Sequence, residues 1–229
     1  MNLKKNMKVA VAWSGGKDSC LACFKAIKES YTVSNLLIMM TDENTSNFHL
    51  INSDLLDAQS TAIGIPIIKQ VTSPDMYENN FRSALLDLKS EGVKGLVTGD
   101  VFNVALHEAG WLDRICREVG LIPIRPLWHL DTKKILTEFI NEGFKAIVVR
   151  IKNEVIGLDW LGREINQIFY EDLLNLGTID PCGEHGEYHS FVVDGPIFKN
   201  RIVITDSEKK TINGYGRLKI KKYKINSKE

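Results

Sequence analysis

One stretch of the chain decides its fold: VAVAWSGGKDSC, residues 9–20. Within it, an apolar run over residues 9–13 leads directly into a polar turn that contains two glycines, two serines, a lysine and an aspartate. The run predicts a buried β-strand, and the apolar spacing over residues 21–27 predicts a helix after the turn. A glycine-rich turn between a strand and a helix is typical of phosphate-binding loops, because the free N–H groups at a helix start attract anions.

The following segments repeat this alternation of strand and helix. Further apolar runs predict strands, and segments with helical spacing and helix start and stop signals lie between them. The predicted strands cover residues 33–40, 65–71, 93–98, 121–127 and 146–151. Strands that are apolar on both faces and alternate with helices indicate a parallel sheet with helices on each side. We therefore expect an α/β fold with a Rossmann-like parallel sheet flanked by helices.

The pattern changes after residue 152. A helix is expected over residues 160–176, and a glycine-rich polar stretch follows over residues 180–196. Polar and apolar side chains then alternate, as they do in antiparallel strands, over residues 201–205 and 218–225. The sequence thus predicts a nucleotide-binding α/β domain and a smaller α+β portion that binds the substrate, in residues 1–152 and 153–229 respectively.

Composition and charge narrow the class of protein. With 44% hydrophobic and 25% charged residues, the 229-residue chain has the make-up of an ordinary globular protein. Because 29 Lys and Arg residues balance 29 Asp and Glu residues, no overall field draws in nucleic acid, and we expect no such partner. The lysine-rich segment 217–228 is typical of a solvated strand face.

No part of the sequence indicates a membrane or an oxidising compartment. An apolar segment of the ~20 residues that span a bilayer is missing, and no signal-peptide pattern opens the sequence. The four cysteines are too few for a disulfide framework in a chain of this length. A cytoplasmic protein without membrane contact is expected.

The polar turn supplies the chemistry that a nucleotide phosphate requires. Its glycines allow the backbone to approach an anion closely, and Lys17 adds a positive charge. The serine hydroxyls can donate hydrogen bonds, whereas Asp18 suits an Mg²⁺ ion on the phosphate better than the phosphate itself. A Walker A loop is excluded, because Asp18 separates Lys17 from the serine that follows. The expected nucleotide-binding residues of the turn are Ser14, Gly15, Gly16, Lys17, Asp18 and Ser19.

The turn S-G-G-K-D-S resembles the loop of the PP-loop, or N-type, ATP pyrophosphatases. The resemblance implies that ATP is cleaved between its α- and β-phosphates. A substrate oxygen is adenylylated, pyrophosphate leaves, and a nitrogen or sulfur nucleophile then displaces AMP. The loop would hold the pyrophosphate portion of ATP, with Mg²⁺ bound to the phosphates.

Three further stretches resemble the diphthine–ammonia ligase family within that superfamily. They are VTGDV at residues 97–101, GLDWLGR at residues 157–163 and DPCGEHGEYHSFVVDGP at residues 180–196. The resemblance covers about residues 8–205. It implies an ATP-dependent ligase that forms an amide from a carboxylate and ammonium. In eukaryotes and archaea, that carboxylate belongs to diphthine on translation elongation factor two.

These stretches supply the remaining candidate site residues. Gly99 and Asp100 follow a predicted strand on the ligand side of the sheet, where Asp100 would hold Mg²⁺ or position the substrate, unless it is only a turn aspartate. Met40, which ends the second apolar run, joins Gly99 among the expected nucleotide-binding residues. The family resemblance implies a role in substrate binding or catalysis for the two glutamates of the third stretch. The expected catalytic residues are Lys17, Asp100, Glu184 and Glu187.

The glutamate-bearing segment departs from the ligase pattern E-G-G-E-Y-E. His185 stands where the ligases have glycine, and His189 replaces a glutamate after the tyrosine. Because both departures spare the ATP loop, ATP chemistry is expected whatever the acceptor is. The acceptor carboxylate is either on a protein, elongation factor two if the host makes diphthamide, or on a small metabolite. Whether the chain forms a homodimer also stays open.

Two other functions remain open from the residues alone. PP-loop enzymes that thiolate tRNA use cysteines, and Cys20, Cys23 and Cys182 are the candidates here, although packing of a helix explains the first two. The other alternative is a non-catalytic protein that binds ATP or AMP and regulates. Formation of pyrophosphate distinguishes this binder from either enzyme.

Two further clusters have both a functional and a structural interpretation. Cys182, His185 and His189 have a spacing that suits three zinc ligands, but no fourth ligand is near, and a substrate loop explains the glycines equally well. A second set lies on one predicted helix close in sequence to Asp100 and either faces the acceptor or decorates the surface. It comprises His107, Glu108, Trp111 and Arg114.

Overall fold

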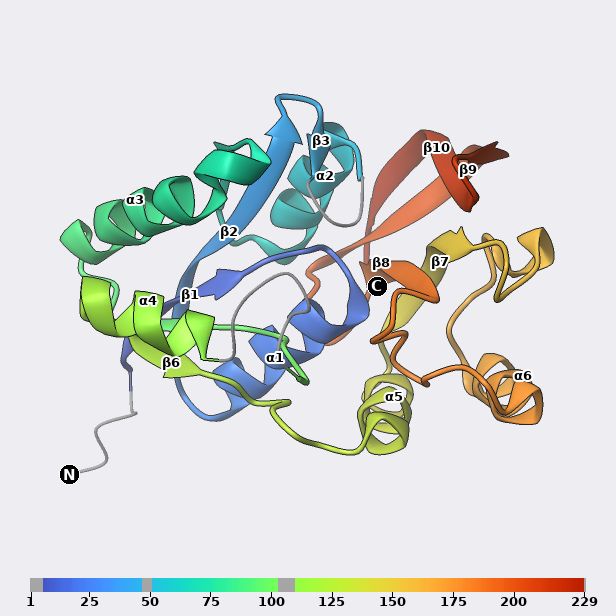
Figure 1. The fold of residues 1–229 in the computed structure, drawn as a ribbon, viewed down its shortest axis with the longest axis horizontal. Helices are drawn as coiled ribbons and strands as arrows, with labels where there is room; N and C mark the ends of the chain where they lie inside the picture. The colour runs from blue at the N-terminus through green and yellow to red at the C-terminus, as the bar shows by residue number, and fades with distance from the viewer. Residues whose placement is uncertain (1–5, 47–50, 103–109, 229) are drawn as a thin grey trace. The chain divides into compact units, whose positions relative to one another are not determined.

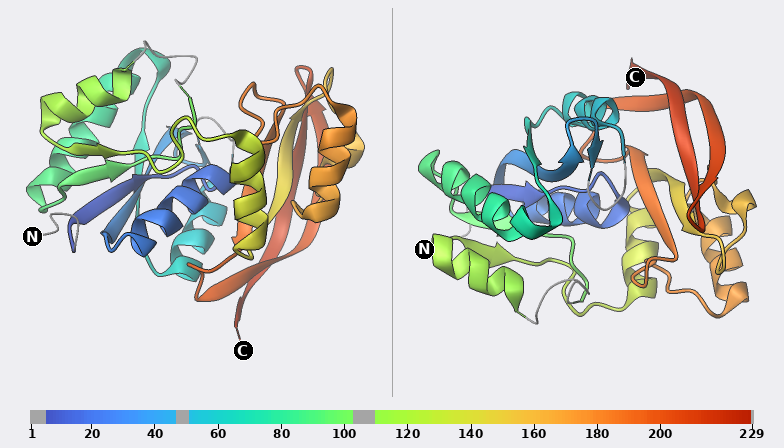
Figure 2. Two further views of the ribbon diagram at one scale, coloured as in Figure 1. Left: turned by 90° about the horizontal axis from the view of Figure 1, so that it is seen from below. Right: turned by 45° about the horizontal axis from the view of Figure 1, so that its top comes forward.

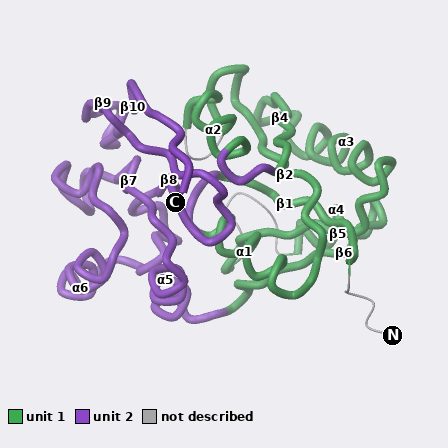
Figure 3. The backbone as a smooth tube through the Cα atoms, turned by 180° about the vertical axis from the view of Figure 1, so that it is seen from behind, with its two compact units in different colours: residues 1–14, 18–61, 65–129 green, residues 15–17, 62–64, 130–229 purple. Residues whose placement is uncertain are grey.

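The computed structural model describes residues 6–46, 51–102 and 110–228. The chain divides into two compact units, which Figure 3 colours separately. Unit 1 comprises Met1–Ser14, Asp18–Thr61 and Ile65–His129, and unit 2 comprises Gly15–Lys17, Ala62–Gly64 and Leu130–Glu229. The domain boundary expected after residue 152 falls inside unit 2 and stays a prediction. Among the residues described, no helix combines the length and apolar character that crossing a membrane requires.

Unit 1 contains a mainly parallel sheet (Figure 1). Its strands are β1 (Lys8–Ala12), β2 (Thr32–Asp42), β3 (Thr45–Ser46), β4 (Ile67–Val71), β5 (Gly95–Val97) and β6 (Ile122–Ile124). The parallel strands lie in the order β4-β2-β1-β5-β6, and β3 pairs antiparallel with the end of β2. The strand order therefore reverses between β1 and β5. Open α/β sheets bind ligands outside the carboxyl ends of the strands at such a reversal.

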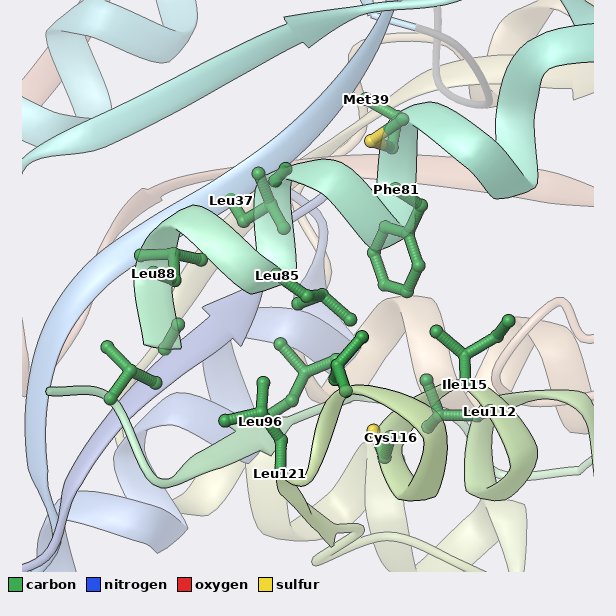
Figure 4. Packing of buried hydrophobic residues seen from close by; sticks show 14 residues of the cluster. Leu37, Met39, Phe81, Leu85, Leu88, Leu96, Leu112, Ile115, Cys116 and Leu121 are labelled. Carbon is green, nitrogen blue, oxygen red and sulfur yellow. The ribbon is translucent and has the colours of Figure 1, made fainter. Parts of the chain in front are cut away.

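Helices cover both faces of this sheet, as the sequence predicts. They are α1 (Lys17–Lys28), α2 (Ser53–Ile63), α3 (Tyr77–Ser90) and α4 (Trp111–Val119). Figure 2 shows α1 and α2 on one side of the sheet and α3 and α4 on the other. In the core of the latter side, Phe81 and Leu85 of α3 and Ile115 of α4 pack with Leu37 of β2 and Leu96 of β5 (Figure 4). These side chains are almost fully buried, which holds the sheet edge near β1 and β5 in a fixed geometry.

Unit 2 contains a separate antiparallel sheet in the order β8-β7-β10-β9. Its strands are β7 (Lys145–Lys152), β8 (Tyr188–Asp194), β9 (Asn200–Ile212) and β10 (Tyr215–Ser227), and its helices are α5 (Thr132–Asn141) and α6 (Gln167–Leu176). Asp131 caps α5 by accepting a hydrogen bond from the N–H of Lys134 at 3.0 Å. Asn213 and Gly214 both adopt positive φ and join β9 to β10 through a two-residue hairpin turn. The polar and apolar alternation near the C-terminus is thus explained by antiparallel strands.

Two predicted elements differ in the structure. The strand expected over residues 146–151 forms, but as β7 it belongs to the antiparallel sheet, because its apolar run has no feature that reveals strand direction. The helix expected over residues 160–176 begins only at Gln167. The residues just before it bond to β7 instead: the N–H of Gly162 donates to the carbonyl of Val148 at 2.9 Å, and the N–H of Ile165 donates to that of Ala146 at 2.8 Å.

Candidate active site

The carboxyl ends of β1 and β5 bring predicted site residues of unit 1 into contact. A Cβ atom built on Gly99, after β5, would lie 2.6 Å from the carbonyl carbon of Asp18 and 2.7 Å from the backbone nitrogen of Ser19. Real Cβ atoms do not approach backbone this closely, so only glycine allows the end of β5 to meet the start of α1. The contact lies where the strand order reverses, which is where this class of sheet binds nucleotides.

Two serines hold the backbone at the start of α1. The hydroxyls of Ser14 and Ser19 lie 3.0 Å apart, and the N–H of Ser14 also donates to the Ser19 oxygen at 3.3 Å. Ser19 is buried in this arrangement. The first N–H groups of a helix have no partner within the helix and carry a partial positive charge. The serine pair therefore fixes the backbone whose N–H groups would meet a phosphate.

The end of β5 adds a hydroxyl that was not among the residues expected from the sequence. The Oγ1 atom of Thr98 is buried and has no hydrogen-bond partner among the described residues. Its backbone N–H is occupied, since it donates to the carbonyl of Ile124 at 3.0 Å. A hydroxyl residue directly after a parallel strand and before a glycine was the available signal. A buried polar atom without a protein partner at a strand end is available to contact a ligand.

Asp100 and Met40 lie at the same carboxyl edge of the sheet of unit 1. Burial, with the Asp100 carboxylate as the second cause, raises the pKa of Tyr77 well above its usual range, so Asp100 lies near that phenol. Met40 ends the parallel pairing of β2 with β4, and its carbonyl accepts the N–H of Thr72 at 2.9 Å. The Met40 side chain is fully buried. A nucleotide contact at Met40 therefore stays a prediction.

The middle of the glycine-rich turn belongs to unit 2. The N–H of Lys17 donates to the Ser190 hydroxyl at 3.1 Å, and its Nζ atom donates to the carbonyl of Cys182. The same ammonium lies 5.3 Å from the ring centre of Tyr188. Gly15 has a φ of +77°, and its carbonyl accepts the N–H of Val192 at 3.0 Å. Lys17 is buried, and these contacts hold its charge against β8 and the segment before it.

The segment before β8 is organised by two carboxylates. Glu187, only 5% exposed, accepts the N–H of Asp180 at 3.0 Å and the N–H of His185 at 2.9 Å, one on each oxygen. Asp180 in turn accepts the N–H of Cys182 at 2.8 Å and that of Glu184 at 3.3 Å. Carboxylates that accept backbone N–H groups stabilise a loop strongly. Glu187 thus has the geometry of a residue that shapes the segment carrying Glu184.

In the described part of the chain, the cysteines and histidines do not gather into a metal site of three or more ligands. No group of three or more His, Cys, Asp or Glu residues there could hold a metal ion. The Cys182 thiol instead lies 3.3 Å from the carbonyl of Thr132. Cys20 and Cys23 are fully buried in α1, and burial raises the pKa of Cys23 to about 12. Thiols of this kind pack a helix and are not nucleophiles at neutral pH.

The helix that follows Asp100 carries an ion network. The indole N–H of Trp111 donates to a Glu78 oxygen at 2.8 Å, and Arg114 donates to both Glu78 oxygens at 2.8 and 3.1 Å. The Arg114 hydrogen bonds, with help from Trp111 and Arg82, lower the pKa of Glu78 to about 2. Trp111 and Arg114 therefore join α4 to α3. The other two members of the predicted set, His107 and Glu108, lie outside the described residues.

Comparison with known proteins places the chain in a family. The model described as the diphthamide synthase N-terminal domain matches residues 7–123, and the model described as the diphthamide synthase C-terminal domain matches residues 131–225. The chain is 25% identical to the protein named diphthine–ammonia ligase from Mus musculus and 24% identical to that from Homo sapiens, in each case over 88% of this chain and 84% of the relative.

Two further similarities involve a longer protein and a solved structure. The Schizosaccharomyces pombe protein of the same name is 25% identical over 88% of this chain but only 37% of its own length. A crystal structure described as a predicted subunit of tRNA methyltransferase from Methanocaldococcus jannaschii aligns with a TM-score of 0.49 at 16% identity, over 82% of this chain and 97% of that one.

Proposed function

The chain belongs to the diphthamide synthase family, and from this premise we propose that it is an ATP-dependent ligase that joins ammonia to a carboxylate of the diphthine type. Relatives that this chain matches over most of their length are named diphthine–ammonia ligase. The observation that carries the proposal is the contact of Gly99 with the Asp18–Ser19 peptide. It brings the end of β5, which carries the oxygen ligands Thr98 and Asp100, against the first turn of α1 at the carboxyl edge of the sheet.

The first half-reaction is adenylylation of the acceptor. A carboxylate oxygen of the acceptor attacks the α-phosphorus of ATP, and the bond from that phosphorus to the bridging oxygen of the β-phosphate breaks. Pyrophosphate leaves with the bonding electron pair. The partial positive charge at the start of α1 and the hydroxyls of Ser14 and Ser19 stabilise the charge that grows on it. Lys17, whose ammonium donates to the Cys182 carbonyl, stays an expected contributor.

The oxygen ligands in unit 1 fit a hard divalent cation. Asp18 provides a carboxylate from the first turn of α1 and Asp100 provides one from the segment after β5, where the buried hydroxyl of Thr98 also lies. Mg²⁺ prefers such oxygen ligands together with phosphate oxygens and water. We propose that Asp18 and Asp100 hold Mg²⁺, which when bound neutralises phosphate charge.

The second half-reaction forms the amide. The nitrogen of ammonia attacks the carbonyl carbon of the acyl adenylate, the bond from that carbon to the phosphate oxygen breaks, and AMP leaves with the bonding electron pair while the new amide nitrogen loses a proton to solvent. Ammonium must first lose a proton, and we assign Glu184 as its acceptor. Glu187 is already occupied by two backbone N–H groups, and its role is to hold the segment around Glu184.

The acceptor that fits the family is diphthine on elongation factor two, in the cytoplasm. Two sequence differences in the segment that carries Glu184 bear on this choice, since His185 and His189 replace the residues of the ligase pattern. A small carboxylate metabolite is the other acceptor chemistry, and it requires the same nucleotide site. Turnover with each class of acceptor separates the two.

The test follows ATP that is labelled at the α-phosphate. Purified protein is incubated with Mg²⁺, ammonium and either diphthine-bearing elongation factor two or the small-molecule fraction of a cell extract. Labelled AMP is expected with the elongation factor, together with conversion of its carboxylate to an amide, seen by mass spectrometry. AMP formed only with the small-molecule fraction would assign a small carboxylate as the acceptor. ATP binding without AMP formation in any mixture would contradict the ligase function.

A matched pair of variants links turnover to the site. Asp18→Asn should lower AMP formation at least ~100-fold, because the carboxylate lies at the phosphate edge. Asp54→Asn also removes a carboxylate from the first turn of a helix in unit 1, but far from β5 in the sequence, and should leave turnover within about twofold. Equal effects of the two substitutions would remove Asp18 from the proposed site.

A further inference from the structure

The antiparallel sheet of unit 2 carries a row of basic side chains across its strands. The register pairs Arg150 of β7 with His189 of β8 on one side and with Arg217 of β10 on the other. Arg217 is in turn paired with Lys210 of β9. Directly opposed residues of antiparallel strands project from the same face with Cβ atoms ~5 Å apart. These four residues, called the basic row below, therefore form one line over the sheet seen in Figure 1.

The centre of the basic row is a pair of like charges. Like charges directly opposite each other on a sheet are destabilising. The guanidinium of Arg150 lies over the Tyr215 ring, 4.2 Å from its centre, which fixes the guanidinium plane. Burial, followed by the charge of Arg217, lowers the pKa of Arg150. The fold therefore maintains two guanidiniums side by side although they repel each other.

The neighbours of this pair are neutralised, whereas Arg217 is not. Lys210 pairs with Glu208 at 2.8 Å, and Lys152, two residues from Arg150 on the same strand face, pairs with Glu154 at 2.5 Å. None of the ion pairs among the described residues includes Arg217. Its Nε atom is buried and has no hydrogen-bond partner within the described ranges. Arg217, at the centre of the basic row, therefore carries a positive charge that no ion pair within the described ranges balances.

We propose that Arg150 and Arg217 bind a phosphate group. A guanidinium is a planar fork whose N–H groups match phosphate oxygens in pairs. A phosphate monoester carries a charge of about −1.5 to −2 at neutral pH, which balances two guanidiniums, whereas a carboxylate balances one. A small phosphorylated molecule supplies this charge with one phosphate group, whereas a nucleic-acid backbone, with one charge on each phosphate, would need two neighbouring phosphates. This site is independent of the ATP-dependent reaction proposed above.

The direct test observes the arginine N–H groups themselves. Two-dimensional ¹⁵N–¹H spectra of the full chain resolve arginine Nε–H resonances, which single Arg→Lys substitutions assign. Titration with inorganic phosphate, and separately with a short single-stranded RNA, should shift the resonances of Arg150 and Arg217 along one common binding curve. Because these signals report on their own surroundings, phosphate that binds at the turn 14–19 does not produce the shift.

Substitution of Arg217 gives a second readout, because phosphate should reverse which of the two chains has the higher melting temperature. Arg217→Gln should weaken phosphate binding at least ~10-fold, as loss of one charge-assisted contact implies. In phosphate-free buffer, the same substitution should leave the melting temperature unchanged or raise it, because the repulsion with Arg150 is gone. With saturating phosphate, the parent chain should become the more stable of the two. Lys219→Gln, a charge-matched control on the same strand, should change neither binding nor this order.

The outcomes separate the source of the phosphate from the existence of the site. Shifts with inorganic phosphate assign a small phosphorylated ligand, and shifts with RNA alone assign a nucleic-acid backbone. The proposal is overturned if neither probe shifts the two resonances. It is also overturned if Lys219→Gln weakens binding as much as Arg217→Gln, because the effect then reflects general charge.

Discussion

Gly99 and Asp18 are in contact through their backbones, although 80 positions separate them in the sequence. The missing side chain of Gly99 leaves the space that the Asp18 carbonyl occupies, so the end of β5 and the start of α1 approach without a gap. This contact closes the edge at which we propose that ATP binds. It also makes the spacing between two carboxylates, Asp18 and Asp100, depend on one glycine.

Gly99→Ala tests this contact directly. The added Cβ meets backbone atoms at 2.6 to 2.8 Å, which cannot move as a flexible side chain would, so β5 and α1 must separate. We expect ATP binding to weaken at least ~10-fold and the free energy of unfolding to fall by about 1–3 kcal/mol. Calorimetric titration with ATP and chemical denaturation measure the two effects.

The control for Gly99→Ala is a glycine with open space around it. Gly143 has no atom within 4 Å of an added Cβ but has a φ of +82°. Gly143→Ala should therefore destabilise the chain by about 1 kcal/mol through backbone strain and leave ATP binding unchanged. If Gly99→Ala binds ATP as the parent chain does, the contact with Asp18 has no part in the nucleotide site.

Glu184 and Glu187 should behave differently when each is replaced by glutamine. Glu187→Gln loses an acceptor for a buried N–H group, so the free energy of unfolding should fall by about 1–3 kcal/mol together with overall turnover. Glu184→Gln should leave stability nearly unchanged and slow amide formation about 100-fold. Its exchange of labelled pyrophosphate into ATP should persist, because adenylylation does not use this carboxylate. Loss of that exchange would contradict the assigned role.

The lowered pKa of Glu78 should make the free energy of unfolding fall in acid. Its pKa is lowered from 4.5 to about 2, mainly by hydrogen bonds from Arg114. A lowered carboxyl pKa adds stability above pH ~4.5, and that stability is lost as the pH falls towards ~2. Glu78→Gln should lower the free energy of unfolding by about 1 kcal/mol at pH 7, after allowance for the partial exposure of Glu78. Near pH 2 it should not change the free energy of unfolding.

Denaturation at a series of pH values measures the effect of Glu78→Gln. The control is Glu154→Gln, which removes a carboxylate that is 68% exposed and should change stability by less than about 0.5 kcal/mol. If the difference in free energy of unfolding between Glu78→Gln and the parent chain stays constant down to pH 2, the hydrogen bonds from Arg114 and Trp111 do not lower the pKa of Glu78.

The buried thiols provide a test against sulfur transfer. Because burial raises the pKa of Cys23 to about 12 and that of Cys20 well above its usual range, neither forms a thiolate at neutral pH. Cys20→Ala and Cys23→Ala should each cost about 1 kcal/mol of stability and leave AMP formation intact. Alkylation of both thiols in the native chain should be slower than in denaturant by orders of magnitude. Loss of turnover in either variant, with the fold retained, would support the tRNA-thiolating alternative.

Local patterns in the sequence were sufficient for the elements of unit 1 and for the chemistry of its loop. The apolar run before Ser14 and the glycines after it identify a strand, a glycine-rich turn and a helix, because strand burial and helix starts depend on neighbouring residues. The position of Gly99 after another apolar run placed it at the ligand edge for the same reason. Strand direction is not local, and so β7 was expected in the wrong sheet.

Local residue patterns are enough to identify a strand, a glycine-rich turn and a helix in this chain, and they predict which side chains suit ATP. The contacts of those side chains come from the tertiary structure. It separated Glu187, whose oxygens hold two backbone N–H groups, from Glu184, and it paired Arg150 with Arg217 across two strands. Such pairings arise from strand register and from the close approach of distant backbone segments. Many distant residues fix both together, and no local pattern encodes either one.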